Sequence, residues 1–501
     1  MLKFALLLVS IFLLTISHWI THLFGQSVTM EQMVFHVLVG RDAVESTDFS
    51  VIKSFIKWNI ILPISMAVIF TLVIHIAHLS KKENLLHCLK HKAFLWLKFI
   101  KKSCIFTRDI ILKITGTKAT YFLFLLFSLG CFSYTTHLLD YVKTFYSKDS
   151  FTTLYVNPKK IDFIKPSNKK NLILIYVESL EYNLRNSQIH NSNLIKAIDN
   201  LDGINVLLTP APGTGWSIAG MTSSQCSIPL KSFYGNSLNT KNTFLPNLIC
   251  LGDILKHYGY TQYFLTGNEV KFAGKDKFYK NHGYDYIYGS NEWKQKGVNA
   301  SLFNGWGNGI HDDTLFSEAK KIIAKSAALK RPYNLTLITI DSHAPNGWAS
   351  PRCSAKDKDS GFRGAFHCSS QFVANFINDL DAKGMLANTM VIIMGDHPFM
   401  DTPKQSYLFP KPRYVYFKII DRDNKKTPTR DRMVHFDVAP TILDLLGILN
   451  GENAQFGLGF SLFSKLSKSD YSNHFSKVTD NNILNHSIIY DAFWLPKSDQ
   501  N

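Results

Sequence analysis

Three long apolar runs near the start of the chain restrict its possible folds more strongly than any other feature. They lie at about residues 2–24, 58–78 and 119–139. Each run reaches the ~20 residues that an α-helix needs to cross a bilayer. A cleaved signal peptide is an alternative for the first run, but that run is long, contains His18 and His22, and precedes no clear cleavage site. We therefore predict a membrane domain, residues 1–140, with three transmembrane helices.

The charges between these runs predict how the helices are oriented. Residues 79–118 hold ten Lys or Arg against two acidic residues, a net charge of +8 in a chain whose net charge is +17. A basic loop between two spans usually lies in the cytoplasm, so loop 25–57 and everything after about Asp140 are expected outside it. We therefore expect a multi-pass protein of the cell inner membrane, with a cytoplasmic N-terminus and a periplasmic C-terminal domain. Because the basic charge gathers beside membrane spans, it does not predict binding of nucleic acid.

The basic loop itself allows two interpretations. Apolar and cationic residues alternate from Leu95 to Lys102. This pattern fits an amphipathic helix that lies on anionic lipid headgroups, and it fits a solvated loop equally well.

After a polar linker, residues 141–170, the chain alternates between apolar strands and helices. Continuous apolar runs rich in β-branched residues predict buried strands at 171–177, 204–208, 260–266, 335–340 and 390–394. Helical patterns fall between and after them, at 251–255, 311–329, 372–380 and 436–448. This order predicts an α/β domain, 171–465, with a mostly parallel sheet covered by helices on both faces. In the tail, 466–501, Ser487–Leu495 is expected to pack back on the domain as a short strand.

Seven cysteines are divided between the two predicted compartments. Cys88, Cys104 and Cys131 fall in the basic loop and the third apolar run, whereas Cys226, Cys250, Cys353 and Cys368 fall in the outer domain. Four cysteines allow three pairings. We favour Cys226–Cys250 and Cys353–Cys368, because each pair closes a short loop in a compartment that permits disulfides. Four free thiols are the alternative, and a zinc site is disfavoured because the chain has no C-x-x-C motif.

Polar residues follow three of the predicted strands. Glu178 comes directly after the first strand, His343 follows the strand at 335–340, and Asp396-His397 follow the strand at 390–394. The carboxyl ends of parallel strands meet at one edge of a sheet, which is where such folds bind ligands. A Gly-rich turn, Gly213–Gly215, leads to Ser217 at a predicted helix start, so this hydroxyl is expected at the same edge.

These residue types predict a phosphoryl-transfer site that binds a divalent metal. Glu178, Asp396, His397 and Ser217 make a four-ligand set suited to Mn, Zn or Mg. Ser217 is then the nucleophile, activated by the metal and by the helix N-terminus. His343 is the candidate acid–base group, and Lys275 the cation that neutralises phosphoryl charge. Taken individually, the residues also allow purely structural interpretations. Ser217 fits an N-cap, the Asp-His pair fits a surface turn, and Lys275 fits a solvated side chain.

The order of these motifs resembles the alkaline phosphatase/sulfatase superfamily. Within it, the chain is most similar to the membrane-anchored branch of lipoteichoic acid synthases and phosphoethanolamine transferases, and there to phosphoglycerol transferases of osmoregulated periplasmic glucans. The resemblance covers nearly all of the outer domain. The segments that carry it are Tyr176–Glu181, Gly213–Pro229, Cys250–Leu255, Phe272–Lys275, Asp341–His343, Gly395–His397 and the D-x-x-P-T-x-L-D-L-L-G helix that begins at Asp437.

The resemblance implies a reaction and its substrates. A phosphoglycerol group would pass from phosphatidylglycerol, with release of diacylglycerol, to glucose residues of a periplasmic glucan. The metal would be Mn or a similar divalent ion held by Glu178, Ser217, Asp396 and His397. A three-helix anchor suits a lipid donor, because it keeps the site above the outer leaflet.

Three residues depart from the family pattern. Ser217 stands where the family usually has Thr, Ala344 where a second His is often found, and Pro398 where an aliphatic residue is expected. Serine offers the same hydroxyl with fewer rotamer restrictions. These departures bear on the identity of the acceptor more than on metal binding.

Three alternative functions remain to be compared with this one. A phosphoethanolamine transferase or phosphodiesterase acting on a cell-surface glycolipid would use the same scaffold. A sulfatase needs a C/S-x-P-x-R motif, and the segment Cys226–Leu230 has neither its spacing nor its arginine. A protein that binds lipid or glucan without turnover is disfavoured, because Glu178, Asp396 and His397 are all present.

Overall fold

The computed structural model describes residues 1–25, 28–39, 49–82, 113, 117–231, 243–400, 402, 405–449, 452 and 454–495. These residues form two compact units. The first comprises the described residues of Met1–Met30 and Phe49–Leu139, and the second those of Glu31–Asp48 and Asp140–Asn501. Most of the basic loop, including Cys88, Cys104 and the alternating stretch Leu95–Lys102, lies outside the described residues.

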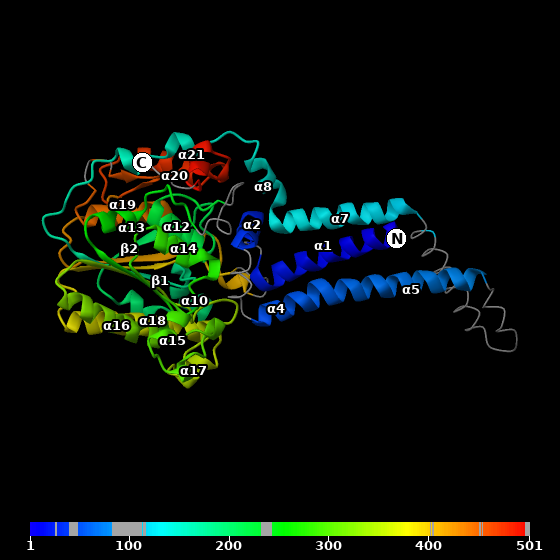
Figure 1. The fold of residues 1–501 in the computed structure, drawn as a ribbon, viewed down its shortest axis with the longest axis horizontal. Coiled ribbons are helices and arrows are strands. Elements are labelled where there is room, and N and C mark those ends of the chain that lie inside the picture. Colours follow the sequence, from blue (N-terminus) through cyan, green and yellow to red (C-terminus); the bar gives the residue numbers. More distant parts are fainter. Residues whose placement is uncertain are drawn as a thin grey trace. The chain divides into compact units, whose positions relative to one another are not determined.

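The first unit consists of long apolar helices (Figure 1). The segments Leu2–Phe24, Val51–Leu79 and Lys118–Thr136 are long and apolar enough to cross a membrane. They correspond to α1 (Leu2–Phe24), to α4 (Phe49–Ile56) continuing through a π-helical turn into α5 (Leu62–Lys82), and to α7 (Lys118–Thr136). The π-turn, Lys57–Ile61, lies just before Pro63, which has no N–H to complete the regular ladder.

The second unit is built on an eight-stranded sheet with the strand order β4-β3-β5-β1-β6-β7-β2-β8. Its strands are β1 (Asn171–Val177), β2 (Ile204–Thr209), β3 (Thr261–Thr266), β4 (Tyr286–Tyr288), β5 (Tyr333–Ile338), β6 (Thr389–Gly395), β7 (Val415–Ile420) and β8 (Arg432–Val434). In the part of the chain that the structure describes, β7 is the one antiparallel strand of this sheet. The prediction of a mostly parallel sheet is therefore confirmed.

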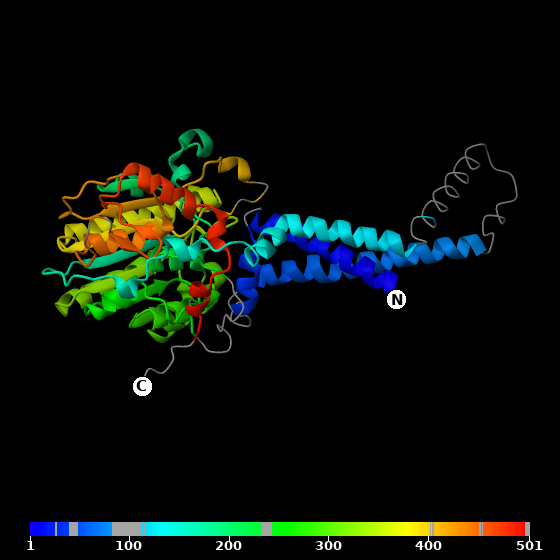
Figure 2. The same ribbon diagram turned by 90° about the horizontal axis from the view of Figure 1, so that it is seen from above.

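Helices cover both faces of this sheet, as predicted (Figures 1 and 2). One face carries α12 (Ser217–Cys226), α13 (Leu251–His257), α14 (Lys275–Asn281) and α19 (Val438–Leu445). The other carries α10 (Ser187–His190), α15 (Ser290–Gln295), α16 (Asp312–Ala328), α17 (Ala355–Lys358) and α18 (Phe362–Ala382). Strand β1 contributes side chains to the hydrophobic cores on both faces of the sheet. Leu172, Leu174 and Tyr176 pack into one core, and Ile173, Ile175 and Val177 pack into the other.

Two disulfides close the short loops that the sequence favoured. Cys226 bonds to Cys250, which joins the end of α12 to the start of α13, and Cys353 bonds to Cys368 of α18. Both pairings are confirmed.

Three segments differ from expectation. The loop between the first two spans contains a helix, α2 (Met30–Val39), and Phe35 of that helix lies fully buried in the core of the second unit. The linker contains two short helices, α8 (Leu138–Thr144) and α9 (Phe151–Leu154). The strand predicted at Ser487–Leu495 is wrong: after α20 (Lys468–Val478), the tail forms the helix α21 (Ile488–Ala492), because Tyr490 turns into the core while Ile488 and Ile489 stay outside.

Candidate active site

The register of the central strands brings the predicted acidic residues together. Val177 of β1 pairs with Gly395 of β6, so Glu178 and Asp396 leave their strands at the same level. On the other side, β1 pairs with β5, and Thr339 just beyond β5 donates its N–H to Tyr176 O and accepts the N–H of Glu178. The expected gathering of side chains at the carboxyl edge therefore follows from strand pairing alone.

The side chains of Glu178, Asp396 and His397 converge at this edge. His397 Nε2 lies 3.4 Å from Glu178 Oε1 and 3.5 Å from Asp396 Oδ2. One ligand atom from each of the three lies within 4.8 Å of the others, and all three side chains are buried. Nδ1 of His397 donates to the carbonyl of Pro398 (2.7 Å), which leaves Nε2 directed at the carboxylates.

Ser217 completes this group, and it comes from the helix α12 rather than from the end of a strand. It is the first residue of α12, and its Oγ lies 3.3 Å from His397 Nε2 and 3.4 Å from Glu178 Oε2. The side chain is half-buried, so it remains reachable from outside. All four residues of the predicted ligand set are thus adjacent.

The close approach of α12 depends on Gly220. A Cβ added at this position would lie 1.9 Å from the carbonyl oxygen of Asp396. Because Ser217 is one helical turn before Gly220, this contact brings the hydroxyl to the Asp-His pair. The run of small residues after Ser217 therefore has a positional role as well as a packing role.

Glu178, Asp396 and His397 shift one another's pKa values. Burial raises the pKa of Asp396 to about 6, and the neighbouring Glu178 carboxylate adds to this effect. Burial also opposes ionisation of Glu178, but hydrogen bonding and charge from His397 outweigh it and hold that pKa at about 2. Although burial alone would lower the pKa of His397, the two carboxylates raise it to about 9. Near neutral pH the cluster therefore holds two ionised carboxylates and one protonated imidazole.

One carboxylate oxygen of this cluster has no hydrogen bond among the described residues. Asp396 Oδ1 accepts the N–H groups of Ser179 (2.8 Å) and His397 (2.9 Å), whereas Oδ2 is buried without a hydrogen bond among the described residues. A buried carboxylate oxygen without a donor is costly unless something else satisfies it. A divalent cation suits the place, because two carboxylates, one imidazole nitrogen and a hydroxyl surround it.

His343 lies within electrostatic reach of this cluster, and its Nε2 has no hydrogen bond among the described residues. Its Nδ1 donates to the carbonyl of Ala344 (2.8 Å), and its ring stacks on the indole of Trp306 with 4.2 Å between centroids. Burial lowers its pKa, while the charge of Glu178 opposes that shift. A neutral imidazole in this orientation can take up a proton at Nε2 and give it back later.

Lys275 is buried rather than solvated. It starts α14, and its Nζ donates to Asn268 Oδ1 (3.2 Å) and lies 5.4 Å from the centre of the Phe272 ring. Burial lowers its pKa to about 8, and the charges of Glu178 and Asp396 counteract part of that shift. A lysine within electrostatic reach of the cluster is suited to bind a phosphate oxygen.

Several residues that hold the site in place were missed from the sequence. Ser179 has a left-handed backbone with φ 57°, and its Oγ donates to Glu178 Oε1 (2.7 Å). Ser342 donates to the carbonyl of Glu178 (2.7 Å), and His435 bonds the carbonyl of Asp396 (3.0 Å). Ser179 and Ser342 adjoin predicted site residues, which was the available signal, whereas His435 has no local signal because it comes from another part of the fold.

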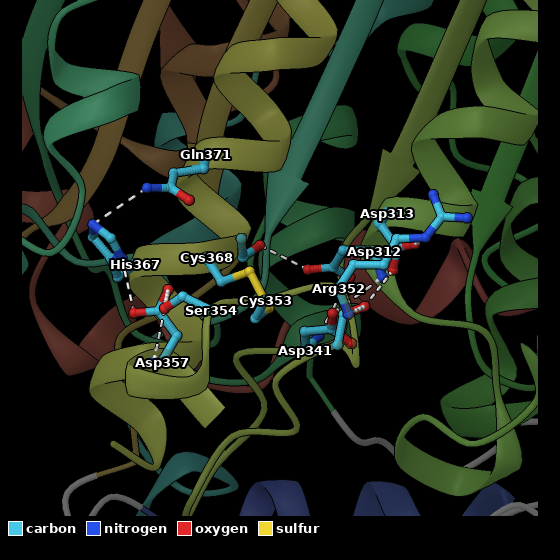
Figure 3. Close-up of a disulfide and its surroundings, with 12 residues drawn as sticks. Asp312, Asp313, Asp341, Arg352, Cys353, Ser354, Asp357, His367, Cys368 and Gln371 are labelled. Carbon is cyan, nitrogen blue, oxygen red and sulfur yellow. Dashed lines mark hydrogen bonds and ion pairs between the residues drawn. A yellow bond between two sulfur atoms is a disulfide. The ribbon is translucent and has the colours of Figure 1, made fainter. Parts of the chain in front are cut away.

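A buried network supports the segment that carries His343 (Figure 3). Asp312, at the start of α16, accepts the N–H groups of Ile340 (2.8 Å) and Asp341 (3.3 Å). Asp341 in turn bonds the ring of His311 (2.7 Å), and Ser369 of α18 donates to Asp312 (2.7 Å). The Cys353–Cys368 disulfide ties α18 to the loop after His343. The backbone after β5 is therefore held by Asp312 of α16, and Ser369 of α18 holds Asp312 in turn.

The chain is similar to known proteins. A family model described as Sulfatase matches residues 170–448. Phosphoglycerol transferase I from Escherichia coli O6:K15:H31 (strain 536 / UPEC) is 36% identical over 333 residues, a match that covers 64% of this chain. The matched region spans only 42% of that relative's length, so the relative contains much sequence outside the comparison.

Two solved structures share the fold. A protein of the alkaline phosphatase superfamily from Vibrio parahaemolyticus superposes with a TM-score of 0.50 at 20% identity, covering 66% of this chain and 78% of that one. The lipoteichoic acid synthase LtaP from Listeria monocytogenes also gives 0.50, at 18% identity, covering 67% of this chain and 96% of that one. At these identities the likeness concerns the fold alone.

Proposed function

Because this chain belongs to the sulfatase family, we propose that it is a metal-dependent transferase that moves phosphoglycerol from phosphatidylglycerol to a periplasmic glucan. The observation that carries the proposal is the placement of Ser217 Oγ within 3.4 Å of both Glu178 and His397 at the sheet edge. The likeness to phosphoglycerol transferase I supports the choice of transferred group.

We assign the metal to Glu178, Ser217, Asp396 and His397. Two observations support this assignment: the buried Asp396 Oδ2 has no hydrogen bond among the described residues, and His397 Nε2 is directed at the two carboxylates and the Ser217 hydroxyl. A bound Mn, Zn or Mg ion would lower the pKa of the Ser217 hydroxyl and polarise a phosphate oxygen. Mn is our first choice, on the strength of the family resemblance.

Ser217 acts as the nucleophile in the first half of the reaction. Its Oγ forms a bond to the phosphorus of phosphatidylglycerol, and the bond from phosphorus to the diacylglycerol oxygen breaks. The serine gives up its proton, and diacylglycerol leaves as the alcohol after gaining one. The product is a phosphoglyceryl ester of Ser217.

The second half regenerates the serine. A hydroxyl of the acceptor glucan attacks the phosphorus, the bond to Ser217 Oγ breaks, and the acceptor's proton is lost as Ser217 regains one. We assign these proton transfers to His343, because its lowered pKa keeps the ring neutral and its Nε2 can take up a proton and return it. Lys275 neutralises charge on the phosphoryl oxygens, since it is cationic below its pKa of about 8.

The second unit carries the site, and we call it the catalytic unit. We propose that it lies in the periplasm beside the inner membrane. The packing of Phe35 supports this, because α2 lies between the first two apolar spans and must be on the same side of the membrane as the unit whose core it joins. The basic charge of residues 79–118 supports a cytoplasmic side for the opposite loop and for the N-terminus.

The proposal is tested with two headgroup-labelled donors. Purified full-length protein is incubated with phosphatidylglycerol or phosphatidylethanolamine, together with an acceptor glucan, with Mn added or removed by a chelator. We expect metal-dependent release of diacylglycerol from phosphatidylglycerol and transfer of label to the glucan. Release from phosphatidylethanolamine alone would favour a phosphoethanolamine transferase, and release of free glycerophosphate without transfer would favour a phosphodiesterase. No release from either donor by a protein that still binds metal would indicate a non-enzyme.

A further inference from the structure

Two segments far apart in sequence form one surface of the catalytic unit. The N–H of His486 donates to Thr144 O at the end of α8 (2.8 Å), and Asn485 Nδ2 donates to Lys148 O (2.7 Å). The hydroxyls of Thr152 and Ser487 bond at 3.0 Å. The segment after α7 and the segment that carries α21 are therefore held side by side.

This surface exposes large apolar side chains. Tyr146 is 88% exposed and Ile488 80%, and Val142 and Ile489 are also exposed. In α21 the fully buried Tyr490 anchors the helix, so its neighbours are held outward. We call Val142, Tyr146, Ile488 and Ile489 the interfacial face. A cluster of this kind on a soluble surface usually marks a place that contacts something apolar.

Basic residues accompany the interfacial face. Lys143 and Lys148 lie on the α8 segment, and Lys159 and Lys160 follow α9; all four are exposed. Acidic residues on the same stretch are Asp140 and Asp149. Apolar side chains flanked by lysine, with a tyrosine among them, match the headgroup region of a membrane that contains anionic lipid.

The chain itself brings this surface close to a bilayer. The apolar helix α7 ends at Thr136 and α8 begins at Leu138, with only His137 between them. At 1.5 Å per helical residue, Val142 lies within about 10 Å of the end of α7 along the chain. Tyr146 follows one turn later.

The same surface is bonded to the segment that follows the nucleophile helix. Lys231 donates its N–H to Tyr490 Oη and its Nζ to Asn485 O, both at 2.8 Å. The side chain of Leu484 lies 3.1 Å from where a Cβ of Gly213 would be, in the turn that leads to Ser217. The position of the tail is therefore coupled to the position of the Ser217 loop.

We propose that the interfacial face rests in the headgroup region of the bilayer and docks the catalytic unit on an anionic membrane surface. The apolar side chains enter the boundary between headgroups and acyl chains, while the lysines contact lipid phosphates. This inference stands on exposure, charge and chain connection, and it does not depend on the proposed reaction.

The test measures contact with lipid directly. The full chain, with Cys88, Cys104 and Cys131 replaced by Ser, is reconstituted in vesicles of phosphatidylglycerol and phosphatidylcholine. An environment-sensitive fluorophore is attached at Ile488→Cys or, separately, at Tyr146→Cys, and nitroxide-labelled lipid is added as quencher. Leu329→Cys, an exposed apolar position after α16, is the matched negative control, and Val73→Cys, in the second apolar segment, is the positive control.

We expect strong quenching at positions 488 and 146, approaching that at position 73, and little at position 329. Replacing Lys148 and Lys160 by Glu, or omitting phosphatidylglycerol, should weaken quenching at 488 and leave position 73 unchanged. Quenching at 488 and 146 no greater than at 329 would overturn the proposal. Shielding of position 488 from aqueous quencher without lipid quenching would also overturn it, and would indicate a protein partner or a second copy of this chain.

Discussion

Asp396 combines two roles that its two oxygens divide between them. Oδ1 accepts two backbone N–H groups and so fixes the loop after β6, whereas Oδ2 lies 3.5 Å from His397 Nε2 and has no hydrogen bond among the described residues. The first role stabilises the fold. The second leaves a negative charge next to Glu178, and that repulsion adds to the burial that raises the pKa of Asp396 to about 6.

The variant Asp396→Asn separates these roles. The amide keeps Oδ1 and removes the charge, so the metal-free protein should melt at the same temperature as the wild type or slightly higher. In the wild type, metal at 100 times its Kd should stabilise the folded protein by about 2.7 kcal/mol and so raise its melting temperature. In the variant this rise on adding Mn or Zn should be lost. Thermal unfolding with and without metal measures both effects.

A matched control for this variant is Asp253→Asn, which removes a carboxylate that pairs with His282 outside the site. That variant should melt lower than the wild type but keep the full metal-induced shift. An unchanged shift in Asp396→Asn would contradict the assignment of Asp396 as a ligand.

Ser217 is one of the three residues expected to depart from the family pattern, and its hydroxyl is the expected nucleophile. Ser217→Ala should lower turnover by about 10³-fold or more, because no group remains to form the covalent ester. Ser217→Thr supplies the same Oγ and should retain most activity. The mass of the intact protein after incubation with donor lipid should show a phosphoglyceryl adduct in the wild type and none in the Ala variant.

Full activity in Ser217→Ala would require another nucleophile, and the sequence offers Thr214 and Thr222 nearby. Both are fully buried. Thr214 Oγ1 donates to the carbonyl of Ala211 (2.7 Å), so it serves the turn. Neither position is accessible to a substrate as Ser217 is, and persistence of the adduct in the Ala variant would contradict the structure as well as the assignment.

At the scale of residues, the sequence predicted which side chains meet but not how each is held. Glu178, Asp396 and His397 were found because each follows a continuous apolar strand. The contacts of Ser342 and His435 with backbone carbonyls depend on how loops from different strands fold against one another. No local pattern carries that information, since the partners are far apart in sequence.

Among the elements, α12 is positioned by the absence of a side chain. Gly220→Ala would put a Cβ 1.9 Å from the Asp396 carbonyl oxygen, so helix or loop must move. We expect a loss of about 1–3 kcal/mol in the free energy of unfolding. Activity should fall further than stability explains, because Ser217 moves with the helix.

Gly215→Ala is the control for this prediction. A Cβ there meets no described atom within 4 Å, and the position has no positive φ. Chemical unfolding and turnover of the two variants should therefore diverge. Equal, small effects at both positions would show that α12 can shift without consequence for the site.

The start of α16 is expected to give the protein a measurable pH dependence. Burial, together with the neighbouring Asp341, raises the pKa of Asp312 to about 8 from its ordinary value of 3.8 (Figure 3). Between these values the folded chain holds a proton that an unfolded chain has released. The free energy of unfolding therefore falls as the pH rises through this window, and none of this loss occurs below it.

Asp312→Asn removes the titrating group while keeping an oxygen for the N–H groups of Ile340 and Asp341. The melting temperature of the wild type should fall more steeply between about pH 5 and pH 8 than that of the variant. Parallel curves for the two proteins would show that Asp312 is not protonated in the folded state.

Elements were predictable where local pattern and final environment agree. The strands β1, β5 and β6 are buried on both faces, so their apolar runs were recognisable to within about two residues at each end. Residues 487–495 misled because Ile488, Ile489 and Tyr490 favour a strand locally, whereas packing of Tyr490 against Phe151 and Phe493 selects a helix.

For the whole molecule, the catalytic unit does not coincide with one continuous part of the chain. The sequence placed residues 1–140 in a membrane domain, yet α2 packs with residues after 140. The ring of Phe35 lies 6.1 Å from those of Trp216 and Phe244, and Trp216 directly precedes Ser217. Loop 25–57 gave no sign of this contact, because a single aromatic anchor has no periodic pattern.

Phe35→Ala tests whether α2 is an integral part of the catalytic unit. Phe35 is completely buried, so truncation should cost about 3–5 kcal/mol of the unfolding free energy of that unit. Val37→Ala, on the same helix but 76% exposed, should change it by less than about 0.5 kcal/mol. Both are measured as thermal unfolding of the full chain in detergent. The Phe35 ring packs against Trp216, the residue that precedes α12. Phe35→Ala should therefore also reduce turnover at temperatures where the unit remains folded. If Phe35→Ala and Val37→Ala behave alike, α2 is only an accessory of the loop, and the catalytic unit is complete without it.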